Sequence, residues 1–192
     1  MKLSRRVSVL ILILSMAAGE AQAFTVNKTP LSSSEKDIQL AGKVIAVAMP
    51  VTAAGIALYK HDRAGLAMLA VESVLTVGTV YGLRSIVKEE RPNGDNYQSF
   101  PSLTTAVSAS GSSFLMARYG WEYGLPATAL THLVSYSVTQ AREHRWYDTL
   151  ASSAIAAGYS WTLVPRLKRK YGIETSFAAS PEGGFMQMSY KW

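Results

Sequence analysis

Five long apolar segments, separated by short breaks, limit what this chain can fold into. They span residues 38–59, 64–87, 103–118, 124–140 and 149–165 and are rich in Ala, Val, Leu, Gly and Ser. Each segment is longer than an ordinary β-strand, and short connections favour antiparallel neighbours. We therefore predict an all-α fold over residues 38–170, an antiparallel bundle of about five to six helices.

Both ends of the chain depart from this pattern. Residues 1–23 have a basic head, a short apolar run and small residues before Phe24, which is the layout of a secretory signal peptide. Residues 24–37 are polar and read as an extended arm that leads into the first helix. Residues 171–192 alternate apolar and polar side chains around a Pro-Glu-Gly-Gly turn, which predicts a C-terminal β-hairpin that covers the bundle.

The charge and the cysteine count narrow the function classes. Removing the signal peptide takes three basic residues and Glu20 from 19 Lys and Arg and 13 Asp and Glu, leaving 16 and 12 and a net charge of +4. This suits an anionic substrate or an acidic membrane surface, and no basic stripe with interleaved aromatic residues indicates nucleic acid. The absence of cysteine excludes disulfides, thiolate metal sites and cysteine nucleophiles. We predict an exported protein of the periplasm, peripheral to or embedded in the envelope membrane.

The apolar segments fit a membrane span poorly. The first contains Lys43 and Pro50, the second contains Glu72, and the third is dense in Ser and Thr, so none is a clean run of about twenty apolar residues. The length criterion favours a soluble or peripheral bundle. Membrane insertion is the alternative, because an outside N-terminus would put the turn at 60–63 and the basic run after Val164 on the cytoplasmic side.

The polar residues that could take part in catalysis or binding lie in two connections of the bundle. Antiparallel helices place alternate connections at one end, so the connection after the second segment and that after the fourth should lie together. Six polar residues from these connections can then converge: Arg84, Arg91, Ser102, Arg142, His144 and Asp148. We take them as candidate site residues.

The first three of these residues suit an anion. Arg84 and Arg91 are about two helical turns apart, and their planar guanidiniums match phosphate oxygens. A solvated face paired with Glu89 and Glu90 would explain either arginine alone. Ser102 precedes an apolar segment, where a helix N-terminus offers N–H groups to an anion. Together they predict a phosphate-binding site.

His144 and Asp148 are one helical turn apart. The carboxylate can therefore hold the imidazole in one tautomer and stabilise its cation, and a histidine oriented in this way can act as nucleophile or base. A lone His–Asp pair is more often structural. The expected position beside the two arginines favours a catalytic role.

These residues resemble the three motifs of the type 2 phosphatidic acid phosphatase (PAP2) family, which is related to bacterial acid phosphatases and vanadium haloperoxidases. The motifs are Lys-x6-Arg-Pro, Pro-Ser-Gly-His and Ser-Arg-x5-His-x3-Asp, and the resemblance covers residues 64–165. Arg84 and Arg91-Pro92 match the first motif, with Arg in place of Lys, and His144 and Asp148 match the third. The usual Ser-Phe-Pro-Ser-Gly-His-Thr-Ala is matched at Ser99, Phe100, Pro101, Ser102, Thr105 and Ala106.

The resemblance implies a phosphatase that works through a phosphohistidine and needs no metal or cofactor. His144 would be the nucleophile, Asp148 would orient it, and Arg84 and Arg91 would clamp the phosphate. In this family the histidine of the second motif protonates the leaving group.

Three departures from the family pattern affect this mechanism. Leu103 replaces the glycine of the second motif, and Thr104 replaces its general-acid histidine. Arg142 lies two residues before His144 where the family has six, and Val138 occupies the expected place; a shortened loop would make Arg142 the equivalent phosphate ligand. A threonine hydroxyl is too weak an acid near neutral pH, and general-acid help is worth about 10²–10⁴ in rate.

The sequence therefore supports one main hypothesis and two alternatives. The main hypothesis is a cell-envelope phosphatase that acts on a phosphorylated or pyrophosphorylated lipid, or on a smaller phosphoester, with catalysis altered at Thr104. The first alternative is a pseudoenzyme that binds a phosphorylated ligand or partner without turnover, and the second is a structural envelope protein. A leaving group that needs little protonation, such as the phosphate of a pyrophosphate, would tolerate Thr104 best.

Overall fold

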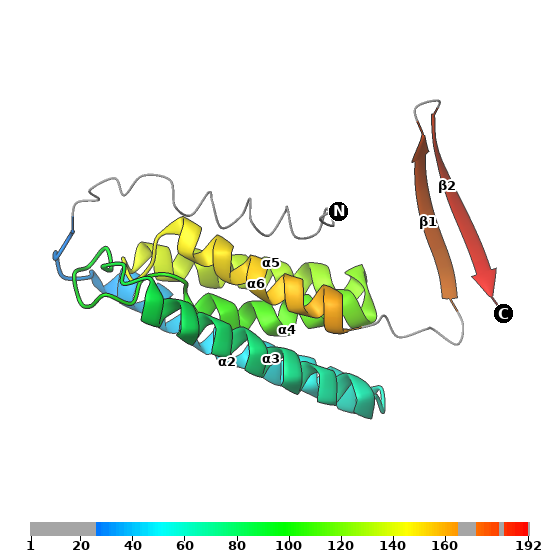
Figure 1. Cartoon of the computed structure of the whole chain (residues 1–192), viewed down its shortest axis with the longest axis horizontal. Helices are drawn as coiled ribbons and strands as arrows, with labels where there is room; N and C mark the ends of the chain where they lie inside the picture. Colours follow the sequence, from blue (N-terminus) through cyan, green and yellow to red (C-terminus); the bar gives the residue numbers. More distant parts are fainter. Residues whose placement is uncertain (1–25, 165–171, 181–182, 192) are drawn as a thin grey trace, which may run out of the picture.

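The computed structural model describes residues 26–164, 172–180 and 183–191, and its helical part is a bundle (Figure 1). The described residues form five helices: α2 (Ser33–Tyr59), α3 (Arg63–Ile86), α4 (Leu103–Tyr119), α5 (Trp121–Gln140) and α6 (Trp146–Leu163). This confirms the predicted all-α bundle. The predicted signal peptide and the basic run after Val164 lie outside the described residues.

The first helix begins inside the segment expected to be an extended arm. Ser32 is the N-cap, its hydroxyl accepting from the Glu35 backbone N–H, while the Glu35 carboxylate accepts from the Ser32 backbone N–H. This reciprocal capping box satisfies two N–H groups that the helix would otherwise leave unpaired. The extended arm described in the structure is therefore residues 26–31.

The C-terminal residues form two antiparallel strands, β1 (Gly172–Ser180) and β2 (Gly183–Lys191). Gly172 pairs with Lys191 and Ser180 with Gly183. Among the described residues these strands contact each other and none of the five helices, and Figure 1 draws them beside the bundle. The expected cover over the bundle is therefore not seen.

The centre of the bundle is α4, which packs against all four other helices. Small side chains fill most of its buried positions, including Ala106, Ser108, Ala109 and Gly111. Their size lets the neighbouring helices approach closely. At Gly111 a Cβ would lie 2.8 Å from the backbone carbon of Met49, so α2 crosses α4 with no room for a side chain.

We predict that Gly111→Ala destabilises the bundle by about 1–3 kcal/mol, because the added methyl overpacks a backbone contact that cannot shift cheaply. Gly78→Ala is the matched control, since a Cβ at Gly78 meets nothing within 4 Å. Removing that helical glycine should stabilise the protein by up to about 1 kcal/mol. Thermal unfolding of both full-length variants in detergent measures the two effects. Equal shifts would contradict the close crossing.

An ion pair closes the end of the bundle that carries the α2–α3 turn. The Asp62 carboxylate accepts from Arg118 Nε at 2.7 Å and Arg118 Nη2 at 2.8 Å, from the Gly65 backbone N–H at 2.8 Å, and from the Tyr119 hydroxyl at 3.0 Å. The hydrogen bonds from Arg118, assisted by those from Gly65 and Tyr119, lower the pKa of Asp62 from 3.8 to about 2. The turn is thereby tied to the end of α4.

We predict that Asp62→Asn lowers the free energy of unfolding by about 3–5 kcal/mol, since it breaks the buried ion pair between Asp62 and Arg118. Because the pKa of Asp62 is lower in the folded than in the unfolded protein, the ionised carboxylate stabilises the fold at pH values above the unfolded-state pKa. This stabilisation is lost as the pH falls through the folded-state pKa. Wild-type stability should therefore fall between about pH 4 and pH 2, and the variant should lose less there. Thermal unfolding across this range measures the difference, and parallel pH profiles would contradict the assignment.

The outer faces of α2 and α3 are apolar. By length and composition both helices could cross a membrane, and less than a third of the most apolar stretch of either is buried within the protein. Large apolar side chains stand exposed on them, among them Val44, Val47, Val51, Val71 and Val74. In a soluble bundle such faces would be polar. The two helices are thus compatible with membrane association.

Candidate phosphate site

Both connections that carry the sequence-predicted residues lie at one end of the bundle. The loop between α3 and α4 runs over the start of α6, where the Ser102 backbone N–H donates to the Asp148 carbonyl oxygen at 3.3 Å. It also meets the end of α5, where the Asn93 N–H donates to the Arg142 carbonyl oxygen at 3.0 Å. Element counting alone led us to expect this meeting.

His144 is buried, with 2% of its surface exposed, and its ring is held by one short hydrogen bond. Its Nδ1 lies 2.7 Å from the Ser99 carbonyl oxygen. A carbonyl oxygen can only accept, so Nδ1 carries the proton and the lone pair of the neutral ring is on Nε2. Within the described residues Nε2 has no hydrogen-bond partner. His144 is therefore in the tautomer that a nucleophile requires.

Asp148 supports this histidine through Ser99. Its Oδ2 accepts from the Ser99 hydroxyl at 2.6 Å and from the Arg145 backbone N–H at 2.7 Å, and it lies 3.7 Å from His144 Nδ1. That last distance is too long for a hydrogen bond. The Asp148 carboxylate thus holds Ser99, and the Ser99 carbonyl oxygen holds the His144 ring. Asp148 itself acts on the ring only through its charge.

Arg84 and Arg91 both present N–H groups without partners. Arg84 is buried and its Nε donates to the Pro101 carbonyl oxygen at 2.9 Å. Within the described residues, Arg84 Nη2 and Arg91 Nε are buried and have no hydrogen-bond partner. The two guanidiniums also repel each other electrostatically. Buried donors of this kind are costly unless an anion accepts from them.

The alternative explanation of these arginines, a solvated face that pairs with Glu89, is not observed. The Glu89 carboxylate accepts instead from Arg145 Nη1 and from the Tyr147 hydroxyl. Burial raises the pKa of Glu89, and the nearby Asp148 charge adds to the rise. Burial also raises the pKa of Tyr147, as does its hydrogen bond to Glu89. Glu89 is thus engaged with α6 and leaves Arg84 and Arg91 to another anion.

The N-terminus of α4 completes this end of the bundle. Ser102 is its N-cap, and the buried hydroxyl accepts from the Thr105 backbone N–H at 3.3 Å. The preceding N–H groups of the first turn have no intrahelical acceptor. Thr104 lies in this turn and is partly exposed. A helix N-terminus beside two arginines is a suitable place for a phosphate.

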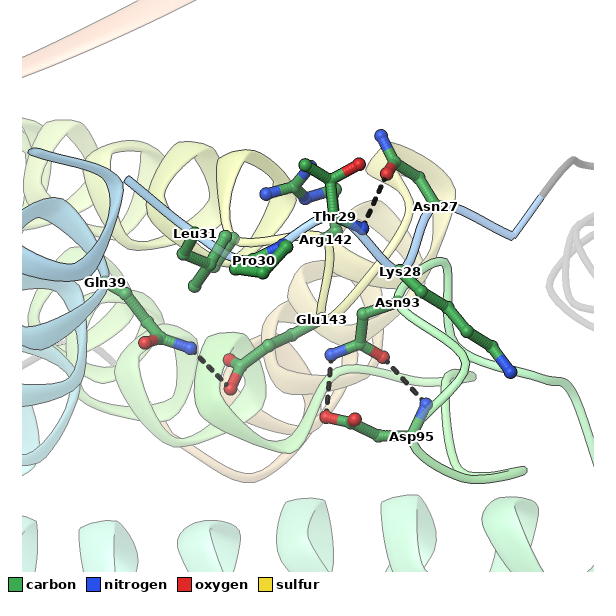
Figure 2. A pocket seen from close by; sticks show the side chains of 11 residues that line it. Asn27, Lys28, Thr29, Pro30, Leu31, Gln39, Asn93, Asp95, Arg142 and Glu143 are labelled. Atoms are coloured by element: carbon green, nitrogen blue, oxygen red, sulfur yellow. Dashed lines mark hydrogen bonds between the residues drawn. The ribbon is translucent and has the colours of Figure 1, made fainter. Parts of the chain in front are cut away.

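Within the described residues, the Arg142 side chain makes no hydrogen bond or ion pair with Arg84, Arg91 or His144. Arg142 has a φ of 56° just after α5 ends, and its Nη2 is 3.6 Å from Glu35 Oε1. Its side chain lines a pocket of about 260 Å³ with residues of the N-terminal arm (Figure 2). Neither Arg84, Arg91 nor His144 lines that pocket.

Four residues near the site were not among the candidate site residues of the sequence analysis: Glu89, Ser99, Arg145 and Tyr147. Ser99 was part of the matched second motif, which was the signal that could have identified it. The pairing of Glu89 with Arg145 and Tyr147 joins residues more than fifty positions apart, and nothing in their spacing indicates it. Among the residues that the structure describes, no three His, Asp or Glu side chains gather as a metal site would require.

Comparisons with known proteins give one informative similarity. No protein-family model matches the chain, and no solved structure matches it. The chain is 26% identical over 185 residues to the lipid A 4'-phosphatase of Helicobacter pylori (strain J99), an alignment that covers 88% of this chain and 92% of that protein. Together with the motif residues, this similarity suggests the PAP2 superfamily.

Proposed function

We propose that this protein is a cell-envelope phosphatase that hydrolyses a phosphorylated or pyrophosphorylated lipid through a phosphohistidine. The observation that carries the proposal is the pair of buried arginine N–H groups, on Arg84 and Arg91, left without partners at the end of the bundle that holds His144. The similarity to a lipid A 4'-phosphatase over most of the chain supports a lipid phosphate as the anion that they bind.

The site supports a two-step reaction. A substrate phosphate would accept from Arg84, Arg91 and the first-turn N–H groups of α4. His144 Nε2 would then attack phosphorus while the bond between phosphorus and the leaving oxygen breaks. The imidazole becomes cationic, and its Nδ1–H still donates to the Ser99 carbonyl oxygen. The Asp148 carboxylate, 3.7 Å away, stabilises that charge. The leaving oxygen departs as an anion and takes a proton from solvent. Water then attacks phosphorus and gives up one proton to solvent, the phosphorus–nitrogen bond breaks, and neutral His144 is regenerated.

The leaving group is the weak point of this mechanism. Thr104 occupies the position of the family's general acid and cannot protonate an alkoxide near neutral pH. A phosphate leaving group needs little protonation. We therefore propose that pyrophosphorylated substrates react faster than alkyl phosphate monoesters.

We further propose that the bundle is embedded in a membrane with the site on the exported side. The apolar outer faces of α2 and α3 support embedding, which the apolar-length criterion had disfavoured. The N-terminal arm and the phosphate site share one end of the bundle, while Lys60 and Arg63 lie at the opposite turn. Basic turns stay on the cytoplasmic side, so the site would face the periplasm.

A pseudoenzyme gains no support from the relative, which is named for its phosphatase activity. The tautomer of His144 also favours turnover, because binding a phosphate requires no histidine with a free lone pair. Catalysis is therefore the function that we propose.

We expect His144→Ala to reduce hydrolysis of a lipid phosphate on the order of 10³-fold or more, because the nucleophile is lost. His132→Ala is the matched control, since His132 is an exposed residue on α5. Phosphate release from lipid substrate by purified full-length protein in detergent measures both. Activity retained in His144→Ala would refute the phosphohistidine mechanism.

We expect Thr104→His to accelerate hydrolysis of a phosphate monoester, by as much as about 10²–10⁴-fold if the full benefit of a general acid is restored. The gain should be smaller for a lipid pyrophosphate, whose leaving group needs less protonation. Thr162→His, on the exposed far end of α6, controls for the mere addition of a histidine. Equal gains on both substrates would show that proton donation is not what Thr104 lacks.

A further inference from the structure

Glu89 is an acidic residue of the α3–α4 loop that takes no part in the proposed reaction and yet fastens this loop to α6. Its carboxylate Oε1 accepts from Arg145 Nη1 and from the Tyr147 hydroxyl. Its backbone carbonyl oxygen accepts from the Ser99 N–H at 3.0 Å. Only 25% of the Glu89 side chain and 12% of the Arg145 side chain are exposed. Because water screens a partly buried ion pair less than a surface pair, the contact between Glu89 and Arg145 is a firm one.

Four hydrogen bonds connect four residues around the start of α6 in a closed network: Glu89, Ser99, Asp148 and Arg145. The Ser99 N–H donates to the Glu89 carbonyl oxygen, and the Ser99 hydroxyl donates to Asp148 Oδ2 at 2.6 Å. The same Oδ2 accepts from the Arg145 backbone N–H at 2.7 Å. Arg145 Nη1 then donates back to Glu89 Oε1. Each member is held by two others, so none of them can shift without breaking a hydrogen bond.

His144 is attached to the closed network at two points. Its Nδ1 donates to the Ser99 carbonyl oxygen at 2.7 Å, and its backbone is continuous with that of Arg145. Ser99 therefore uses all three of its polar groups at this end of the bundle, with Glu89, Asp148 and His144 as partners. The place of the imidazole depends on both sides of the network, the loop side at Ser99 and the helix side at Arg145.

The contact between Glu89 and Arg145 is the one bond of the four that joins two oppositely charged side chains. Hydrogen bonds between charged groups are roughly twice as strong as those between neutral groups. Arg145 Nη1 also donates to the Glu90 carbonyl oxygen at 2.8 Å, so its guanidinium lies on the loop at two places. Removing the Glu89 carboxylate would open the closed network between the loop and α6.

We propose that Glu89 is a positioning residue, which acts through Arg145 to hold His144 in the tautomer that carries its proton on Nδ1. The catalytic consequence rests on the proposed phosphatase function, whereas the hold on the imidazole does not. Arg84 and Arg91 lie outside the closed network. Substrate binding should therefore depend on Glu89 much less than the chemical step does.

The kinetic test compares kcat and KM for hydrolysis of lipid A by full-length variants in detergent. It is run at about pH 8, where a glutamate carboxyl with a raised pKa is still ionised. Glu89→Ala should lower kcat between about ten-fold and 10²-fold, because a small misplacement of the reacting groups is enough, and should change KM little. Glu89→Gln keeps the oxygen acceptor and loses only the charge, so it should fold and should lower kcat less.

Glu90→Ala is the matched control for a lost acidic side chain in the same loop. Among the described residues the Glu90 side chain forms no hydrogen bond or ion pair, and only its backbone accepts from Arg145. Its kcat should stay at the wild-type value. An equal loss in Glu89→Ala and Glu90→Ala would show that the loop's charge matters and that the closed network does not.

A double-mutant cycle tests whether Glu89 acts through Arg145. Arg145→Met opens the closed network at the same bond as Glu89→Ala does. Adding Glu89→Ala to Arg145→Met should therefore lower kcat by less than about two-fold more, because residues that act as a pair are not additive. Independent losses that multiply in the double variant would contradict the proposed route.

Nitrogen NMR of ring-labelled histidine reads the tautomer of His144 without turnover. The chain has three histidines, and the His144 signals are those that disappear in His144→Ala. Wild-type protein should carry the proton on Nδ1 alone, and Glu89→Ala should show exchange between the two tautomers, while the signals of His61 and His132 stay as they are.

Two results would overturn the proposal: unchanged His144 signals in Glu89→Ala, or an unchanged kcat of that variant in an active protein. The phosphatase function fails separately. If the wild type hydrolyses neither lipid A nor a lipid pyrophosphate while the His144 signals respond to Glu89→Ala, the phosphatase function is wrong and the hold of Glu89 on the imidazole stands.

Discussion

The candidate site depends on Ser99, which connects the α3–α4 loop to the residues around the start of α6. Its hydroxyl binds Asp148 and its carbonyl oxygen binds His144, so one residue of the α3–α4 loop orders two residues around the start of α6. All three are almost fully buried, where hydrogen bonds are strong and an unpaired polar group is costly. The position and the tautomer of the histidine follow from this small network. Without it, the arginines would still offer charge, but the ring of His144, the proposed nucleophile, would not be held in one tautomer.

The interior of the bundle is unusually polar for an all-helical fold, and α4 explains why. Several of its hydroxyls bond to neighbouring helices, as where Thr131 of α5 donates to Ser112 and lies 2.8 Å from Ser108 Oγ. Small hydroxyl side chains allow close helix approach and supply hydrogen bonds where lipid gives no hydrophobic drive between helices. An apolar cluster around Phe114 and Leu115 is buried at the same time, while other large apolar side chains are exposed, many of them on α2 and α3. A polar interior with an apolar outer surface fits the proposed membrane location better than it fits a soluble bundle.

Much of the helical architecture could be predicted from the sequence, because segment length and connection length are local properties. Counting connections also brought the two polar loops to one end of the bundle. The details of the site could not be predicted in this way. That Asp148 reaches His144 mainly through Ser99, and that Glu89 turns to Arg145, depends on contacts between residues about fifty positions apart. The spacing predicts Arg142 as a phosphate ligand, and the structure places its side chain in the pocket beside the N-terminal arm. Membrane embedding was disfavoured because Lys43 and Glu72 interrupt the apolar runs, while the structure buries Glu72 completely and pairs it with Ser160.

The division of the site between two connections also determines when the chain becomes chemically competent. Arg84, Arg91 and Ser99 precede α4, whereas His144 and Asp148 are reached only after α5. A partly assembled chain, in which α6 has not yet docked, contains every functional group and yet leaves the imidazole free to exchange between its tautomers. The tautomer of His144 on which the proposed reaction depends is therefore set only where α6 and the α3–α4 loop pack together. The proposed activity would thus be a property of the complete bundle and of no smaller part of it.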